Sequence, residues 1–292
     1  MFALEQYSPL DVLHDRPRAG NFPQHAGKFL AQGDSWFSFG SANPLATGSM
    51  LDPMEFATDC CAVNCAHPGD VLAHMIDQRR ETDFLNLLIG GQSWAWDAIL
   101  LSGGGNDLID FLRTPEVDGQ GRQVARNLRA LLTKDERGAA NTAEAWISED
   151  GWATFVQHLV PQFHEFVALR DSAASKSQGV PIFAHTYDFI TPRNASAGLS
   201  AGPWLYPSLL AYGVPQRYWI GLTRHFLNRL AELMKTLNLP NFHVIDTQGT
   251  LVPADLGSTR DSHDWANEIH PNRDGYRKLA KVFAAGVEAR MP

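Results

Sequence analysis

Five short, largely apolar stretches, each ending in a polar turn, most constrain the fold of this 292-residue chain. They cover residues 29–31, 59–64, 98–102, 180–185 and 242–246. Strands that cover a core on one face alternate apolar with polar residues, whereas continuous apolar stretches suit strands that are buried on both faces. We therefore expect a parallel sheet with helices packed against both of its faces.

Amphipathic segments lie between or after these stretches. Apolar residues recur at helical spacing within residues 71–76, 151–170, 218–237 and 273–290. Strand and helix thus alternate, which predicts one three-layer α/β/α domain over residues 1–292, with right-handed crossovers. In such sheets the reactive groups collect beyond the carboxyl ends of the strands.

The charge balance narrows the range of partners. The chain has 24 Lys and Arg against 32 Asp and Glu, a net charge of −8, so we expect neither a nucleic-acid partner nor an anionic membrane surface. We expect no membrane span, since no stretch has the uncharged length that a span requires. The N-terminal residues lack the pattern of a secretory signal, which predicts a cytoplasmic location.

The three cysteines, Cys60, Cys61 and Cys65, crowd into one apolar segment. Their odd number and their close spacing predict buried free thiols in a reduced compartment. A site made of cysteines alone would need a fourth cysteine to hold a metal ion, and the chain has no other.

Four segments near the ends of the predicted units carry residues suited to acyl transfer. Ser35 follows the first strand in Gly-Asp-Ser, Gly69 follows the second, Asn106 follows the third after three glycines, and His270 precedes the last helix. A serine nucleophile needs a base, a group that orients the base, and donors for an oxyanion. Each segment alone is better explained as a turn, a helix cap or a surface histidine. Their joint occurrence, in order along the chain, indicates a serine hydrolase.

The sequence resembles the SGNH hydrolases, the esterases and lipases that are also called GDSL-like. Gly33-Asp34-Ser35 matches the nucleophile block of that family, with Trp36 where the family often has Leu. Gly69 matches its glycine block, and His270-Pro271 matches the end of its D-x-x-H block. The family's G-x-N-D block is matched by residues 104–107, so that the motifs span nearly the whole chain.

The resemblance implies a flavodoxin-like domain with a five-stranded parallel sheet in the order 2-1-3-4-5. It implies that Ser35 is the nucleophile of an ester hydrolase that works through an acyl-enzyme, without metal or organic cofactor. His270 would be the general base, and the Ser35 N–H, the Gly69 N–H and the Asn106 amide would form the oxyanion hole. With an ordinary histidine pKa of about 6.5, activity would rise through neutral pH.

The α/β-hydrolase class is disfavoured. Its G-x-S-x-G elbow would need a second glycine where this chain has Phe37.

One block departs from the family pattern. Three residues before His270, where the family has Asp, this chain has Asn267; Asp264 lies six residues before and Glu268 two before. An amide can hold the imidazole ring but adds no negative charge, and in serine proteases the exchange of this acid for Asn costs about four orders of magnitude in rate. We expect Asp264 to stand in for the missing carboxylate. The alternatives are a Ser–His dyad with Asn267 alone, or Glu268, which we expect to be solvated.

The segment 191–214 is rich in small and aromatic residues, a composition typical of a lid or substrate-contact insertion. Together with Trp36, its residues Trp204 and Tyr206 are the candidates for substrate binding. Tryptophans suit either an acyl groove or stacking on a sugar, so the acyl chain and the alcohol of a small-molecule ester stay open. Carbohydrate acetylesterase and thioesterase specificity both remain alternatives, and the sequence carries no signal for an oligomeric state.

Two other classes of protein compete with the esterase. A binding protein that keeps the fold without strong catalysis would explain Asn267. A metal-dependent hydrolase would use Asp261, His263, Asp264 and His270, which have suitable oxygen and nitrogen ligands.

Overall fold

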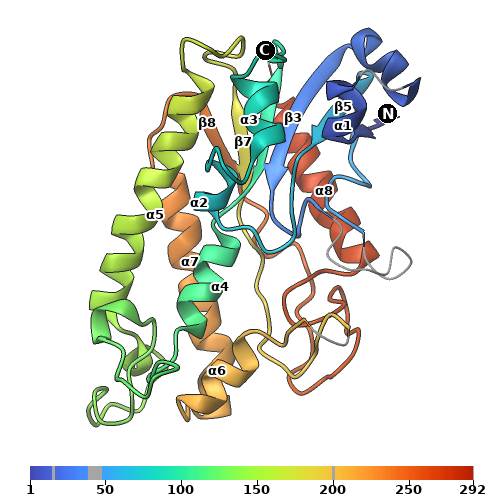
Figure 1. Ribbon diagram of the computed structural model, residues 1–292. Coiled ribbons are helices and arrows are strands. Elements are labelled where there is room, and N and C mark those ends of the chain that lie inside the picture. Colours follow the sequence, from blue (N-terminus) through green and yellow to red (C-terminus); the bar gives the residue numbers. More distant parts are fainter. Residues whose placement is uncertain (15–16, 39–47, 199–200, 292) are drawn as a thin grey trace.

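The fold is built on a six-stranded parallel sheet with helices on both of its faces (Figure 1). The computed structural model describes residues 1–14, 17–38, 48–198 and 201–291. The strands of the main sheet are β2 (Glu5–Tyr7), β3 (Gly27–Gly33), β5 (Cys60–Asn64), β6 (Ala98–Ser102), β7 (Ile182–His185) and β8 (Phe242–Ile245). Strands β1 (Phe2–Ala3) and β4 (Glu55–Phe56) form a small antiparallel pair.

The helices follow the strands in alternation, as the pattern of apolar residues predicts. They are α1 (Pro9–Leu13), α2 (Leu72–Met75), α3 (Thr82–Leu88), α4 (Gly105–Arg113), α5 (Glu149–Arg170), α6 (Leu205–Ala211), α7 (Trp219–Lys235) and α8 (Arg273–Glu288). Short 3₁₀ turns lie at Pro17–Gln24, Arg126–Leu128, Glu144–Trp146 and Gln216–Tyr218.

The strand order is β2-β5-β3-β6-β7-β8. The last five strands of this order are the five predicted stretches, arranged 2-1-3-4-5, so the three-layer α/β/α architecture and the order are confirmed. The count of five strands is wrong, because β2 adds a sixth at the edge by pairing Glu5 with Cys61 and Tyr7 with Val63. This strand has the sequence Glu-Gln-Tyr, and its single buried residue gives no periodic signal.

Side chains on successive residues of β3 enter opposite layers, as the two-residue period of a strand requires. The Phe29 ring contacts Phe56, with ring centroids 5.3 Å apart, on the face where α8 packs. Gln32 points to the other face, where its amide donates to Glu81 just before α3. Figure 1 shows α5 and α8 on opposite sides of the sheet. Strands covered in this way explain why the apolar stretches are continuous.

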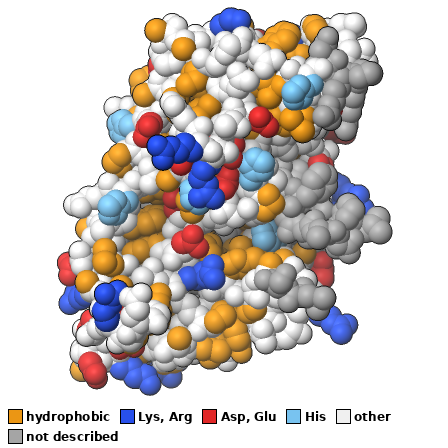
Figure 2. Space-filling model, viewed as in Figure 1, with side chains coloured by type: hydrophobic (Ala, Val, Ile, Leu, Met, Phe, Trp, Pro, Cys, Tyr) orange, Lys and Arg blue, Asp and Glu red, His pale blue; other side chains and the backbone are white. Residues whose placement is uncertain are grey.

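The surface in Figure 2 mixes the two signs of charge. Lys and Arg side chains are interspersed with Asp and Glu on this face, without a broad basic region. Among the described residues, no helix has both the length and the apolar character needed to cross a membrane.

The three cysteines are buried and free, as expected from their clustering. Cys60 and Cys61 lie in β5, and Cys65 directly follows it. Burial raises the pKa of all three thiols, to about 12 for Cys61. They therefore pack as apolar side chains.

Gly33 ends β3 where this strand pairs with the last residue of β6. It pairs with Ser102, and a β-carbon placed on Gly33 would lie 2.7 Å from Ser102 Cβ and 2.9 Å from the Ser102 carbonyl oxygen. A side chain does not fit without moving β6, so glycine is required here by close approach of the backbones. Because Asp34 and Ser35 follow directly, their backbone is positioned by this contact between Gly33 and β6.

We predict that Gly33→Ala lowers the free energy of unfolding by about 1–3 kcal/mol, because the extra carbon overpacks a buried contact with backbone. Urea denaturation measures this change. Gly91→Ala is the matched control, since an added carbon at Gly91 has no atom within 4 Å. Equal losses in the two variants would contradict the close-approach explanation.

Candidate active site

Ser35, Gly69, Asn106 and His270 come together at the carboxyl edge of the sheet. Ser35 lies two residues beyond β3, Gly69 lies in the segment after β5, and Asn106 lies in the first turn of α4, after β6. All four line one cleft of about 240 Å³. The four residues therefore lie together, as the strand-end rule predicts.

Ser35, His270 and Asn267 form a chain of hydrogen bonds. Ser35 Oγ lies 2.8 Å from His270 Nε2, and His270 Nδ1 lies 3.0 Å from Asn267 Oδ1. All three residues are buried. The chain has the serine–histidine–acceptor connectivity of an activated serine.

The backbone decides which end of the Asn267 amide faces the ring. Asn267 Oδ1 also accepts hydrogen bonds from the N–H groups of Ile269 (3.1 Å) and His270 (2.9 Å). An amide nitrogen could not accept from these donors, so the oxygen must face Nδ1. Nδ1 therefore carries the proton, and Nε2 presents its lone pair to the Ser35 hydroxyl.

Burial lowers the pKa of His270 to about 4. The low-dielectric surroundings disfavour the imidazolium, and the neighbouring amide oxygen adds no charge to offset this cost. The ring is thus a neutral acceptor throughout the neutral range. The expectation of an ordinary histidine pKa is wrong for this reason.

Asp264 does not stand in for the missing carboxylate. Its two oxygens lie 2.7 and 2.6 Å from Lys278 Nζ, and Oδ2 also accepts from the Val252 N–H at 2.7 Å. These contacts tie the loop before α8 to Lys278 of α8 and to the backbone of Val252. The expectation that Asp264 orients His270 is therefore corrected in favour of Asn267, which lies in the family's own position.

Glu268 is completely buried, and the expectation that it is solvated is also wrong. Its carboxylate accepts from four backbone N–H groups: Arg193 (3.1 Å), Trp204, Leu205 (2.9 Å) and Tyr206 (2.7 Å). Burial raises the pKa of Glu268, while the four donors favour its charged form and oppose this shift. One side chain of the His270 loop thus fixes both ends of the stretch 193–206.

Arg193 makes the reciprocal connection from the segment 191–214 to the His270 loop. Its buried guanidinium donates to the carbonyl oxygens of Arg260, Trp265 (3.3 Å) and Asn267 (2.6 Å). Sequence reasoning missed Arg193, and it missed that Glu268 is buried and binds the stretch 193–206, because a charged residue in a polar loop gives no sign that it is buried.

The three aromatic residues predicted to bind substrate, Trp36, Trp204 and Tyr206, lie in three different environments. Trp204 lines the cleft and sets its ring edge-on against His270, with centroids 5.3 Å apart. Trp36 is buried beside Ser35, and its indole N–H donates to the Ile269 carbonyl at 3.2 Å. Tyr206 instead packs edge-on against Trp219, at 5.6 Å between ring centroids. Tyr206 is therefore not brought to the cleft.

Asn106 and Gly69 are the other two residues that the sequence predicts for an oxyanion hole. Asn106 Nδ2 donates to the Asp70 carbonyl at 3.0 Å, which fixes the plane of an amide with two hydrogens. Gly69 has a φ of +83°, a left-handed conformation that favours glycine. Both residues border the cleft beside Ser35.

A buried polar network beneath Ser35 was not expected from the sequence. Asp34 accepts from Tyr187 Oη (2.5 Å), Ser102 Oγ (2.8 Å) and the Trp36 N–H (2.9 Å). Ser102 Oγ also lies 2.9 Å from His185 Nε2. Burial raises the pKa of Asp34 to about 6, against these donors, which lower it. Ser102 and His185 end predicted strands, and this position is the signal that could have found them.

The four residues of the metal-site alternative are engaged separately. Asp261 contacts Asn272, His263 contacts Asp255, and Asp264 and His270 have the partners described above. Within the described part of the chain, no group of three or more His, Cys, Asp or Glu side chains has a metal-binding arrangement.

Comparisons with known proteins give similar structures only. No protein-family model and no curated protein matches the sequence. An extracellular lipase from Streptomyces rimosus is similar with a TM-score of 0.49 and 13% identity, over 88% of this chain and 100% of that one. An acetylxylan esterase from Geobacillus stearothermophilus has a TM-score of 0.43 and 14% identity, over 90% and 94%. The aryl esterase of M. smegmatis has a TM-score of 0.42 and 11% identity, over 90% and 99%. These likenesses are too distant to assign residue roles, which must rest on the geometry of this chain.

We predict that Glu268→Gln lowers the free energy of unfolding by about 2–4 kcal/mol, because one amide nitrogen would leave two buried backbone donors without an acceptor. Urea denaturation gives the value. Glu165→Gln, on the exposed side of α5, should be neutral within experimental error. Wild-type stability in Glu268→Gln would show that the carboxylate does not hold the insertion.

Proposed function

We propose that this protein is a serine ester hydrolase that cleaves carboxylic esters through an acyl-enzyme at Ser35. The observation that carries the proposal is the 2.8 Å contact between Ser35 Oγ and a His270 ring whose tautomer is set by Asn267. A buried histidine held as a neutral acceptor against a serine hydroxyl is the arrangement that general-base activation requires.

The first half-reaction acylates the enzyme. Ser35 Oγ attacks the ester carbonyl carbon while His270 Nε2 takes the hydroxyl proton, and the carbonyl oxygen becomes an oxyanion. The Ser35 N–H, the Gly69 N–H and the free hydrogen of the Asn106 amide donate to that oxyanion. The intermediate collapses by breaking the carbon–oxygen bond to the alcohol, which leaves with the proton from Nε2.

The second half-reaction returns the enzyme to its starting state. Water attacks the Ser35 ester, His270 Nε2 takes one proton from it, and the same donors stabilise the second oxyanion. Collapse releases the carboxylic acid, and Ser35 Oγ recovers its proton from Nε2. In these steps Asn267 holds the ring by a neutral acceptor.

The amide at position 267 is compatible with this cycle. In serine proteases, exchanging the acidic member for Asn costs about 10⁴ in kcat through the wrong histidine tautomer. Here the N–H groups of Ile269 and His270 hold the amide oxygen toward Nδ1, so the productive tautomer is favoured. What Asn267 lacks is the negative charge that would stabilise the transient imidazolium.

We predict that Ser35→Ala lowers kcat for phenyl acetate by at least about 10⁴-fold, as expected when the nucleophile of a coupled site is removed. Ser175→Ala, at a buried serine outside the cleft, should keep wild-type kcat. Stopped assays with product quantified by chromatography measure both. Equal kcat in Ser35→Ala and wild type would end the proposal, and saturable binding of esters without turnover by the wild type would favour the binding protein instead.

We predict that kcat/KM has its acidic midpoint near pH 4 and is flat through neutral pH, because the pKa of His270 is lowered to about 4 by burial. Asn267→Asp places an anion beside Nδ1, favours the imidazolium, and should raise the midpoint by about 1–3 pH units. Profiles of kcat/KM for phenyl acetate test this, with near-UV circular dichroism to verify that both proteins stay folded. A wild-type midpoint near 6.5, or no upward movement in Asn267→Asp, would contradict the assignment.

A further inference from the structure

Ser35 lies between two cavities of very different size. One is the cleft of about 240 Å³ described above, and the other, which we call the inner pocket, has about 30 Å³ of free space and is lined mostly by buried residues. Ser35 and Asn106 border both cavities. A substrate carbonyl that is bound at the nucleophile and the amide donor would therefore point one of its substituents into each cavity.

The position of His270 decides which substituent goes where. His270 lines the cleft and is not among the residues that line the inner pocket. In the proposed reaction His270 Nε2 protonates the leaving alcohol, so the alcohol must lie on the histidine side. The acyl chain is then directed into the inner pocket. This assignment rests on the proposed function.

The inner pocket is apolar and small. Its walls include Trp36, Ile109, Ile190, Leu227 and Ile269. A water-sized group occupies roughly 10–15 Å³ on this measure of free space, so there is room for about two such groups. The methyl of an acetyl group or the ethyl of a propionyl group matches this free space, whereas a longer chain exceeds it.

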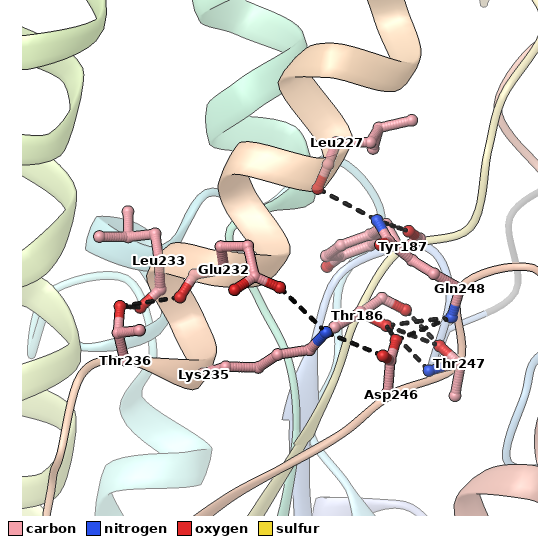
Figure 3. A network of polar contacts seen from close by, with 10 residues as sticks. All are labelled: Thr186, Tyr187, Leu227, Glu232, Leu233, Lys235, Thr236, Asp246, Thr247 and Gln248. Atoms are coloured by element: carbon pink, nitrogen blue, oxygen red, sulfur yellow. Dashed lines mark hydrogen bonds and ion pairs between the residues drawn. The ribbon is translucent and has the colours of Figure 1, made fainter.

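Two of the residues that line the pocket, Tyr187 and Leu227, are held in place by hydrogen bonds. Gln248 Nε2 donates to the carbonyl oxygens of Tyr187 and Leu227, both at 3.1 Å, and so links the segment after β7 to α7 (Figure 3). The backbone N–H of Gln248 donates to Thr186 Oγ1 at 3.2 Å. The Tyr187 hydroxyl is fixed by Asp34 at 2.5 Å. The extra methylenes of a longer acyl chain would press against residues that are fixed in this way, and such overpacking is costly.

The cleft is suited to a larger group. Trp204 lines it together with Gly69, Ala197 and Ala201, which contribute backbone and small side chains. Flat aromatic walls with nearby polar backbone groups are typical of sites that hold a ring.

We propose that the substrate is an ester of a two- or three-carbon acid with a ring-bearing alcohol, the acid being selected by the inner pocket and the alcohol by the Trp204 side of the cleft.

The acyl assignment is tested with naphthyl esters from acetate to octanoate. The wild type should hydrolyse acetate and propionate best, with kcat/KM at least about 10-fold lower for hexanoate, since overpacking by extra methylenes opposes binding. Leu227→Ala should move the optimum to longer chains while keeping the Gln248 bond to the backbone carbonyl. Leu222→Ala is the matched control, a buried leucine of α7 that does not line the pocket. Thermal unfolding of each variant sets an assay temperature at which it is folded.

The alcohol assignment is tested with naphthyl acetate and ethyl acetate. Trp204→Ala should lower kcat/KM for naphthyl acetate relative to ethyl acetate by about 10-fold, as expected for a lost aromatic contact that excludes water, and should leave the acyl-length profile of the naphthyl series unchanged.

A wild-type optimum at hexanoate or longer would overturn the inference without the need for any variant. So would an acyl profile that responds to Trp204→Ala and not to Leu227→Ala, which would reverse the two assignments. Either result leaves the proposed function standing, provided that turnover depends on Ser35. Absence of hydrolysis for every ester would instead remove the proposed function, and this inference with it.

Discussion

The oxygen of one neutral side chain organises the whole site. Asn267 Oδ1 accepts two backbone N–H groups of its own loop and the Nδ1 proton of His270. The backbone donors fix the oxygen, the oxygen fixes the tautomer, and the tautomer leaves Nε2 free to accept from Ser35. Without the two backbone donors the amide could rotate and present its nitrogen to the ring. His270 Nε2 would then no longer be fixed as the acceptor for the Ser35 hydroxyl.

Buried charges hold the loops that carry this arrangement. Asp34 lies next to Ser35 and accepts from Tyr187, while Glu268 and Arg193 join the His270 loop to the segment 191–214. A buried charge is costly unless fixed partners surround it, and removing those partners is strongly destabilising. Each of these groups is surrounded by donors or acceptors from another segment. This restricts the positions that the segments can take relative to one another. These buried hydrogen-bond networks explain how polar loops can keep the side chains of the site within hydrogen-bonding distance of one another.

The sheet and the main site residues could be predicted because they depend on local pattern. Continuous apolar stretches specify strands that are buried on both faces, and parallel strands bring Ser35 and Asn106 to one edge. The edge strand β2 could not be found, since three residues with one buried tyrosine give no periodicity.

The choice among Asp264, Asn267 and Glu268 could not be made either, because it depends on the path of one loop. Bridges from Trp265 to Ser262 and Pro271 turn that loop back on itself, and His263 adopts a φ of +51°. The turn directs Asp264 toward Lys278 and Glu268 toward the segment 191–214. The spacing of residues along the chain does not predict which way these side chains point. For the same reason it does not distinguish Trp204, which lines the cleft, from Tyr206, which does not.

The central claim is that His270 activates Ser35 while held by a neutral acceptor. Covalent labelling with a fluorophosphonate, followed by peptide mass spectrometry, tests it most directly. The account predicts one phosphonyl group on the peptide that contains Ser35 in the wild type, and a rate of labelling that falls at least about 10²-fold in His270→Ala, because general-base catalysis contributes at least this factor. Labelling of Ser35 at an unchanged rate in folded His270→Ala, or no labelling of Ser35 in the wild type, would contradict it.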